Sequence, residues 1–260
     1  MSTRRSVQKA ELIELAEVTS WPTDVVALLR KASSAFPKRP RPYATDLRFG
    51  PDIDESFERQ LRGMLADRLL AMYHATRLLP EEIEVIRAQG IQLLTPALRA
   101  MKLRTLVDRG LMSRAESDTW ESLGPLTWPG QESRLNEASI FAPLECLREP
   151  DLFQSLLHDW GGESISRAAT KPGREGADDI ADGLRSLLRR VNEVSTPSVI
   201  AVAVSAADLP RSPYLWQVMI GRLVRALKPC NEWHVKTPLP VTDVIQPGHS
   251  RWKSTWLRRR

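Results

Sequence analysis

The chain has 260 residues, 42% of them hydrophobic and 27% charged, with a net charge of +5 and an isoelectric point near 9.5. This apolar fraction suffices to bury a substantial core, either as one large domain or as a domain with an appended segment. No uncharged apolar run approaches the roughly 20 residues that cross a bilayer, and residues 1–6 lead into a charged segment rather than into the apolar core of a signal peptide. We therefore expect no membrane partner and a cytoplasmic location.

Residue types that bind metals or carry redox chemistry are few. Cys146 and Cys230 lie far apart and outside the close spacing of zinc and redox sites, so we expect two reduced, partly buried thiols. None of the four histidines has the i, i+4 pairing beside an acid that a helical metal site uses. The sequence therefore predicts no metal.

Residues 1–50 are predicted to form an N-terminal helical segment and a proline-rich linker. The apolar positions of residues 7–18 have helical spacing, and Pro22 is placed to open a second helix. Three prolines in residues 37–42 remove backbone donors and favour extended backbone. Such a composition is typical of a linker or of a strap laid over the surface.

Residues 51–250 are predicted to form an α+β domain, and residues 251–260 a basic tail. Helical patterns cover residues 52–69, 80–90, 96–124, 150–160, 180–191 and 215–227. Ser113, with Glu116 three residues later, marks a new helix start within the third of these ranges. Strand patterns cover residues 70–77, 137–143, 197–204, 231–236 and 241–245, with a short extended piece at 91–94. Their irregular order predicts a small mixed sheet of about five to seven short strands flanked by helices.

Glycine-rich motifs of well-known nucleotide and nucleophile sites are absent from the sequence. There is no GxGxxG, no GxxxxGK[ST] and no GxSxG. Rossmann, P-loop and nucleophile-elbow chemistry is therefore not indicated. The strand at residues 70–77 instead carries polar side chains at its end, just before a helix that Pro80 opens, and a ligand could reach His74 at this junction.

Two sequence elements resemble a known enzyme family. Tyr73-His74-Ala75-Thr76 resembles the Tyr/Phe-His-x-Thr element that opens the ADP-ribosyltransferase fold of the diphtheria-toxin and poly-ADP-ribose-polymerase type. Glu232-Trp233-His234-Val235 looks like the late strand of that fold, which begins with the catalytic glutamate, and residues 238–245 look like the strand that closes it. The resemblance covers residues 70–247.

The resemblance implies an NAD site. By it, His74, with Tyr73 beside it, hydrogen-bonds the ribose next to nicotinamide, and Thr76 supports the same pocket. Glu232 would orient a ribose hydroxyl and stabilise the positive charge that develops as nicotinamide leaves, because an oxocarbenium-like transition state is stabilised by a fixed anion. The family's middle strand carries a tyrosine that stacks on nicotinamide; here the nearest aromatic residue is Phe141, which has a similar π-face.

Two further residues are candidates for this site. Glu163 follows Trp160 and two glycines that let a ligand approach the backbone, so it competes with Glu232 as the catalytic carboxylate. Arg77 is a candidate for binding the NAD pyrophosphate, because a guanidinium binds phosphate in a bidentate manner.

Two functions remain open from the sequence. The leading hypothesis is an NAD-consuming ADP-ribosyltransferase-like enzyme, with NAD as substrate and no metal. It would be a bacterial toxin or phage-defence effector that modifies a protein or nucleic-acid acceptor and has a cognate antitoxin. The alternative is a non-catalytic nucleic-acid- or partner-binding accessory protein, whose working surface is the basic tail with Trp252 and Trp256.

Overall fold

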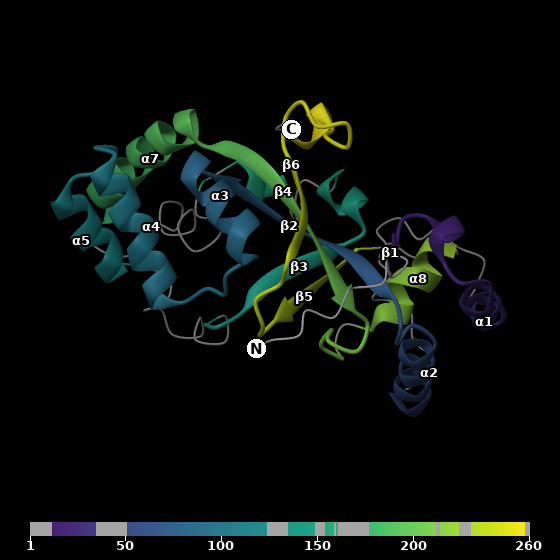
Figure 1. Cartoon of the computed structure of the whole chain (residues 1–260). Coiled ribbons are helices and arrows are strands. Elements are labelled where there is room, and N and C mark those ends of the chain that lie inside the picture. The colour runs from purple at the N-terminus through teal and green to yellow at the C-terminus, as the bar shows by residue number, and fades with distance from the viewer. Residues whose placement is uncertain are drawn as a thin grey trace, which may run out of the picture. The chain divides into compact units, whose positions relative to one another are not determined.

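The computed structural model describes residues 12–34, 51–123, 135–148, 154–158, 160, 177–211, 214–223 and 230–257. In these residues the chain has an α+β fold, as predicted, with one sheet and helices around it (Figure 1). The predicted linker at residues 37–42 and the last three arginines lie outside the described residues. Within the described part we find no helix with the length and apolarity that a membrane span requires.

The sheet is mixed. Its strands are β1 (Leu12–Ile13), β2 (Leu69–Leu78), β3 (Ala138–Ala142), β4 (Thr196–Ser205), β5 (Asn231–Val235) and β6 (Val241–Ile245). Their order is β5-β3-β2-β4-β6, and β1 adds a short parallel pairing to β2, whereas β3 is antiparallel to β2. β2 and β4 are each 10 residues long, and nearly all their side chains are buried or half-buried, as expected of central strands.

Most helices begin close to where the sequence predicts. They are α1 (Thr23–Ser33), α2 (Pro51–Met64), α3 (Pro80–Gln89), α4 (Pro96–Asp108), α5 (Arg114–Leu123), α7 (Ala177–Val194) and α8 (Leu215–Leu223). Prolines open α3 and α4, where a missing N–H costs no hydrogen bond. Gly90 ends α3 with a φ of 83°, and a Cβ there would overlap the carbonyl oxygen of Leu239.

Two helix predictions were wrong within the described residues. Residues 7–18 were expected to be helical, but Leu12–Ile13 form β1, and the first α-helix begins at Thr23. The apolar residues that suggested an amphipathic helix serve strand pairing instead: Ile13 pairs with Leu70 and is buried. In the predicted helix at 150–160, Gln154–Leu157 form a short 3-10 helix.

The chain divides into two compact units, which are described separately. Unit 1 consists of Met1–Tyr73, Ile140–Cys146 and Val202–Trp233. Unit 2 consists of His74–Ser139, Leu147–Ala201 and His234–Arg260. The predicted boundaries near residues 50 and 250 therefore do not coincide with those of the units, since each unit is assembled from segments far apart in the sequence.

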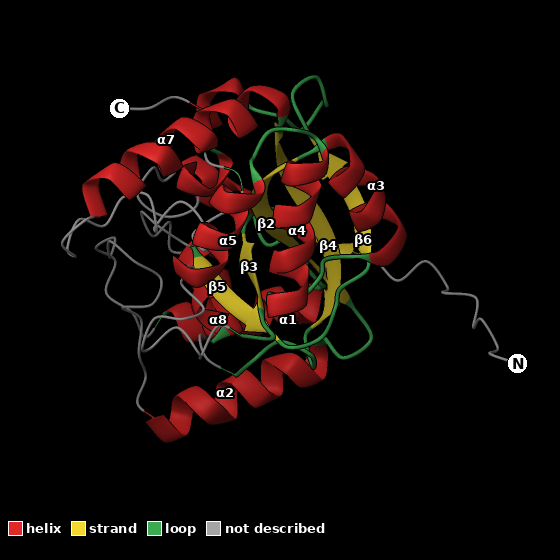
Figure 2. Ribbon diagram, turned by 90° about the vertical axis from the view of Figure 1, so that its left-hand side faces the viewer, coloured by secondary structure: helices red, strands yellow, loops and turns green. Residues whose placement is uncertain are grey.

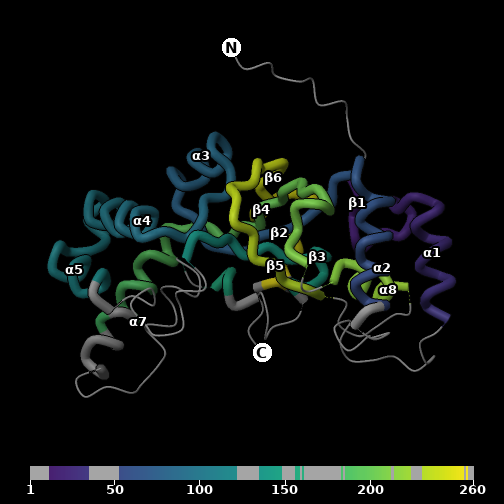
Figure 3. Tube along the Cα trace, turned by 90° about the horizontal axis from the view of Figure 1, so that it is seen from below, coloured from purple at the N-terminus to yellow at the C-terminus, as the bar shows by residue number. Residues whose placement is uncertain are grey.

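In unit 1 a buried acid and its partner arginine join α2 to α8. Figures 1 and 3 show α1, α2 and α8 side by side. The Glu58 carboxylate accepts hydrogen bonds from the backbone N–H groups of Leu215 and Trp216, at 3.0 and 3.1 Å, and thereby satisfies donors in the first turn of α8. It also pairs with Arg62 Nε at 2.7 Å. Arg62 donates in turn to three carbonyl groups after β4, those of Ala206, Leu209 and Pro210.

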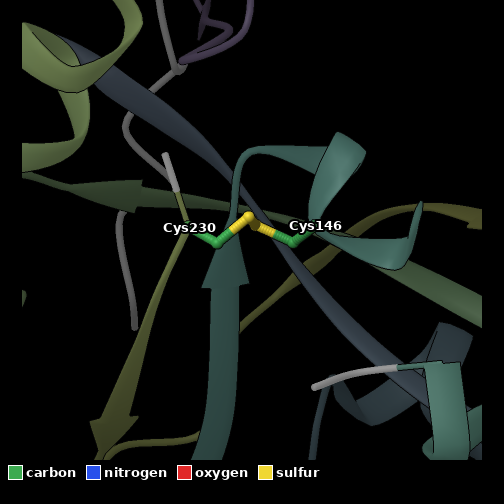
Figure 4. Close-up of a disulfide and its surroundings, with 2 residues drawn as sticks. All are labelled: Cys146 and Cys230. Carbon is green, nitrogen blue, oxygen red and sulfur yellow. A yellow bond between two sulfur atoms is a disulfide. The ribbon is translucent and has the colours of Figure 1, made fainter. Parts of the chain in front are cut away.

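A disulfide between Cys146 and Cys230 corrects the prediction of reduced thiols. The two Cα atoms are 5.5 Å apart although 84 positions separate the residues in sequence. Figure 4 shows the bond joining the chain just beyond β3 to the chain just before β5. These strands are neighbours in the sheet, and no spacing rule could have revealed their proximity. Disulfides persist in oxidising compartments and are rare in reducing ones, so this pairing does not support the cytoplasmic location expected from the sequence.

In unit 2 the helices share an apolar cluster, and Glu82 forms hydrogen bonds to residues at the edge of this cluster. Figure 2 shows α4 with α5 on one side and α3 on the other. The cluster comprises Leu79, Leu103, Leu106, Met112, Trp120, Trp160, Leu187, Leu188 and Val191. The Glu82 carboxylate accepts from Leu79 N at 2.7 Å, from Trp160 Nε1 at 2.8 Å and from Lys102 Nζ at 2.5 Å. Lys102 Nζ also lies 5.1 Å from the centre of the Trp160 ring, within cation–π range.

The Glu58–Arg62 pair should be far more important for stability than an exposed pair. Glu58→Ala is expected to lower the free energy of unfolding by roughly 3–5 kcal/mol, because it leaves the charge of the largely buried Arg62 without its carboxylate partner and removes the acceptor for two N–H groups at the start of α8. The matched control is Glu84→Ala, which breaks the exposed Arg87–Glu84 pair and should cost less than about 1 kcal/mol. Denaturant unfolding measures both; equal losses would contradict this interpretation.

The predicted capping box at the start of α5 should give a pH-dependent stability. Ser113 N donates to Glu116 Oε2 at 2.6 Å, and this bond is the main reason that the pKa of Glu116 lies below its usual 4.5. A lowered folded-state pKa means that the contribution is complete above 4.5 and is lost as the pH falls through the lower value. Glu116→Gln should therefore cost about 0.5–1 kcal/mol at neutral pH. The free energies of unfolding of the wild-type protein and of Glu116→Gln should become equal as the pH is lowered. A difference between them that does not change with pH would exclude a charge effect.

Candidate functional site

His74 lies in the second half of β2, and the backbone of β3 fixes its imidazole. His74 Nδ1 is 2.7 Å from the carbonyl oxygen of Ser139. A carbonyl can only accept, so Nδ1 carries the proton, and the neutral ring then has an unprotonated Nε2. The side chain is half-buried. This hydrogen bond thus selects, for the neutral ring, the tautomer with its proton on Nδ1.

A polar cluster in unit 2 adjoins this contact through Ser139. It consists of Glu137, Ser139, His234 and Lys236. The Ser139 hydroxyl is 3.3 Å from His234 Nδ1, so one serine contacts His74 through its carbonyl and His234 through its side chain. Glu137 Oε2 is 3.8 Å from His234 Nδ1, and Glu137 Oε1 is 3.7 Å from Lys236 Nζ. Two imidazoles, a hydroxyl and a carboxylate therefore lie close together in and next to this cluster.

The sequence had assigned no role to Glu137, Ser139 or His234. The signal available in the sequence was the alternation of side chains along a strand, because residues two positions apart lie on the same face. His234 therefore lies on the same face of β5 as Glu232, and the burial of β5 alternates accordingly. Nothing local indicated that the start of β3 and the end of β5 meet.

Thr76 and Arg77 have intramolecular partners. Thr76 is buried, and its hydroxyl donates to the Arg77 carbonyl at 3.3 Å. The Arg77 guanidinium donates to the carbonyls of Leu157, Asn192 and Ser195 at 3.2, 2.6 and 2.7 Å, and to the Ser195 hydroxyl at 3.1 Å. Asn192 and Ser195 are at the C-terminal end of α7, where carbonyls lack helical partners. Arg77 thus caps a helix, and its geometry does not support the expected contact with pyrophosphate.

Tyr73 and Phe141 meet in the core of unit 1. They are register partners of β2 and β3, and their ring centres are 6.1 Å apart. Tyr73 is fully buried, and its hydroxyl donates to Glu14 at 2.6 Å; Phe141 is 2% exposed. A ring enclosed to this degree offers no face to a ligand, so the stacking role expected for Phe141 has no support. Along β2, Tyr73 and His74 lie on opposite faces.

Of the two candidate carboxylates, Glu163 lies outside the described residues. Glu232 is the second residue of β5, as expected for a glutamate at the start of the late strand. It is half-buried, whereas its neighbours Asn231 and Trp233 are buried. Glu232 therefore sits on the more open face of a strand whose other face is packed.

The basic tail does not form the expected stacking platform in its described part. Trp256 is 2% exposed and lies in a short 3-10 helix, Ser254–Leu257. Its ring is edge-on to that of Trp252, with centres 5.2 Å apart. A buried tryptophan cannot stack on a base, which removes one support of the nucleic-acid hypothesis. Across the described residues we also find no group of three or more potential metal ligands.

Arg77 is expected to act in stability and not in ligand binding. Arg77→Met should cost roughly 2–4 kcal/mol, because it leaves several partly buried carbonyls without donors. Arg77→Lys should also destabilise the protein, since an ammonium group cannot make the several hydrogen bonds that the planar guanidinium makes at once. Thermal unfolding measures the loss of stability in both variants. Their NAD affinity is compared with that of the wild-type protein at a temperature at which all three are folded. Normal stability with lost NAD affinity would instead favour the pyrophosphate role.

Comparison of the chain with models of protein families finds no match, and searches of curated proteins and of solved structures find none either.

Proposed function

We propose that this chain is an NAD-consuming ADP-ribosyltransferase-like enzyme that uses Glu232 as its catalytic carboxylate and His74 to bind ribose. The observation that most supports the proposal is the strand order β5-β3-β2. His74, Phe141 and Glu232 lie on these strands, roughly 65 and 90 residues apart in sequence, yet the strands are consecutive neighbours in the sheet. The closing element of the resemblance, residues 238–245, contains β6, which lies at the other edge of the sheet beside β4. The strand order therefore brings the strand of His74 and the strand of Glu232 to the two edges of β3, as the resemblance requires of a shared site.

The proposed chemistry needs little from the protein beyond one anion and a binding surface. The bond between ribose C1′ and the nicotinamide nitrogen breaks, and its electron pair stays with nicotinamide, which leaves as a neutral molecule. Positive charge develops on C1′ and the ribose ring oxygen. Glu232 stabilises this charge and accepts a hydrogen bond from a ribose hydroxyl. A nucleophile of the acceptor, or water, then forms the new bond to C1′ and releases its proton.

The fixed tautomer of His74 supports its role. With Nδ1 donating to Ser139, Nε2 is the atom that accepts a hydrogen bond from a ribose hydroxyl. Thr76 lies on the same face of β2, two residues away, and by the resemblance it would support the same pocket. Tyr73, Phe141 and Arg77 have no ligand role in this proposal, because their side chains are engaged in packing and helix capping.

For the acceptor we propose a protein or a nucleic acid. The net charge of +5 favours an acidic or polyanionic target. Roles as a toxin or phage-defence effector with a cognate antitoxin remain part of the hypothesis from the sequence, and no contact in the described residues adds to them.

The decisive experiment measures nicotinamide release from NAD. The wild-type protein should release nicotinamide, and Glu232→Gln should lower kcat by about 10²-fold or more, since it removes the anion that stabilises the transition state. His74→Ala should raise KM more than it lowers kcat, since it removes a ribose contact present in the bound substrate. Glu163→Gln decides between the two carboxylates, because the catalytic one gives the larger loss of kcat.

Two controls match these variants in residue type. His249→Ala removes a histidine that contacts Asp243 and Arg251, and Glu84→Gln removes an exposed acid of α3. Both should leave turnover unchanged. Wild-type turnover that survives in both His74→Ala and Glu232→Gln would overturn the site assignment, and absence of NAD binding and turnover in the folded wild-type protein would overturn the function.

A further inference from the structure

We propose that the Cys146–Cys230 disulfide holds the start of β5, and with it Glu232, in position, so that the oxidised protein is the active form. The part of this inference that concerns activity rests on the proposed function, whereas the part that concerns β5 does not. Cys146, Cys230 and Glu232 all belong to unit 1.

The disulfide lies next to the residue that it is proposed to position. Cys230 immediately precedes β5, and Glu232 follows two residues later. Cys146 lies in the 3-10 helix Leu144–Arg148, which directly follows β3, and it is fully buried. The bond therefore ties the start of β5 to the far end of its neighbouring strand, as Figure 4 shows.

Other described contacts at the start of β5 are weaker than a covalent bond. Asn231 Nδ2 is 3.5 Å from the carbonyl oxygen of Tyr214, which is at the limit of a hydrogen bond. Trp233 is fully buried and anchors the chain on the other side of Glu232. Once the disulfide is removed, the start of β5 retains its packing and the pairing of β5 with β3, but it loses its covalent link to the chain after β3. Catalysis is sensitive to such a change, because a displacement of about 1 Å can cost about 100-fold in rate.

The two cysteine residues differ in exposure, and this difference favours one direction of reduction. Cys146 is 0% exposed, whereas Cys230 is half-buried. A thiolate of a dithiol reductant should therefore attack Sγ of Cys230, break the disulfide and release Cys146 as a thiolate that takes up a proton. The second thiol of the reductant then breaks the mixed bond and frees Cys230. Two electrons pass to the protein, and the dithiol becomes a disulfide.

The first experiment tests the bond and its polarity without any substrate. Peptide mapping of the protein purified without reductant should find Cys146 linked to Cys230. Brief treatment with glutathione should give the mixed disulfide at Cys230 and not at Cys146. Free thiols at both positions in the untreated protein, or glutathione mainly on Cys146, would overturn the inference.

The second experiment follows β5 itself by hydrogen exchange. Reduction with dithiothreitol should speed exchange of the Asn231–Val235 amides at least about tenfold, while α4, in unit 2, serves as the control and should not change. Cys146→Ser/Cys230→Ser should exchange like the reduced wild-type protein and should not respond to dithiothreitol. Unchanged protection of β5 after complete reduction would refute a positioning role, whether or not the protein turns over NAD.

The third experiment links the bond to activity. Dithiothreitol should lower nicotinamide release by the wild-type protein at least about tenfold through kcat, and reoxidation should restore it. The double serine variant should have the low rate with or without dithiothreitol. Wild-type turnover that is insensitive to complete reduction would refute the redox dependence and leave the proposed function intact. Complete absence of turnover in the oxidised wild-type protein would instead refute the proposed function.

Discussion

The geometry of the candidate site depends on β3, a strand of five residues that pairs with β2 on one edge and β5 on the other. Its Ser139 carbonyl sets the tautomer of His74, and its Ser139 hydroxyl contacts His234. Phe141 packs on Tyr73, and Cys146 follows shortly after the strand. A strand with two neighbours must satisfy backbone groups on both edges, so its position is strongly constrained. This constraint places polar groups from distant parts of the sequence within hydrogen-bond range.

Local signals in the sequence were sufficient to predict much of the fold. Pro80 begins α3 and Gly90 ends it, because each residue suits the backbone of a helix end. Ser113 and Glu116 satisfy backbone donors at the start of α5. The apolar run that forms β4 likewise indicated a central strand. The prediction failed at Leu12–Ile13, whose apolar residues fit both a helical and a strand pattern. There the pairing with β2, a long-range contact, decides the structure.

The site was less predictable, because its residues take their roles from partners that are distant in sequence. The strand locations of His74 and Glu232 followed from the local sequence patterns at residues 70–77 and 231–236. The helix-capping role of Arg77 did not, since its acceptors lie 80 to 118 positions away. Phe141 had the right ring for stacking, but burial against Tyr73 could be seen only once β2 and β3 were paired. The same pairing logic explains the unexpected disulfide.

Arg62 and Arg77 direct their guanidinium groups largely to backbone carbonyls, Arg62 at the turn after β4 and Arg77 at the end of α7. Two of the chain's cations therefore act as hydrogen-bond donors for the framework. A partly buried bond to a neutral acceptor is screened little by dissolved ions, unlike an exposed pair of opposite charges. The fold of this basic protein should therefore remain stable at ionic strengths that would release a polyanion from its surface.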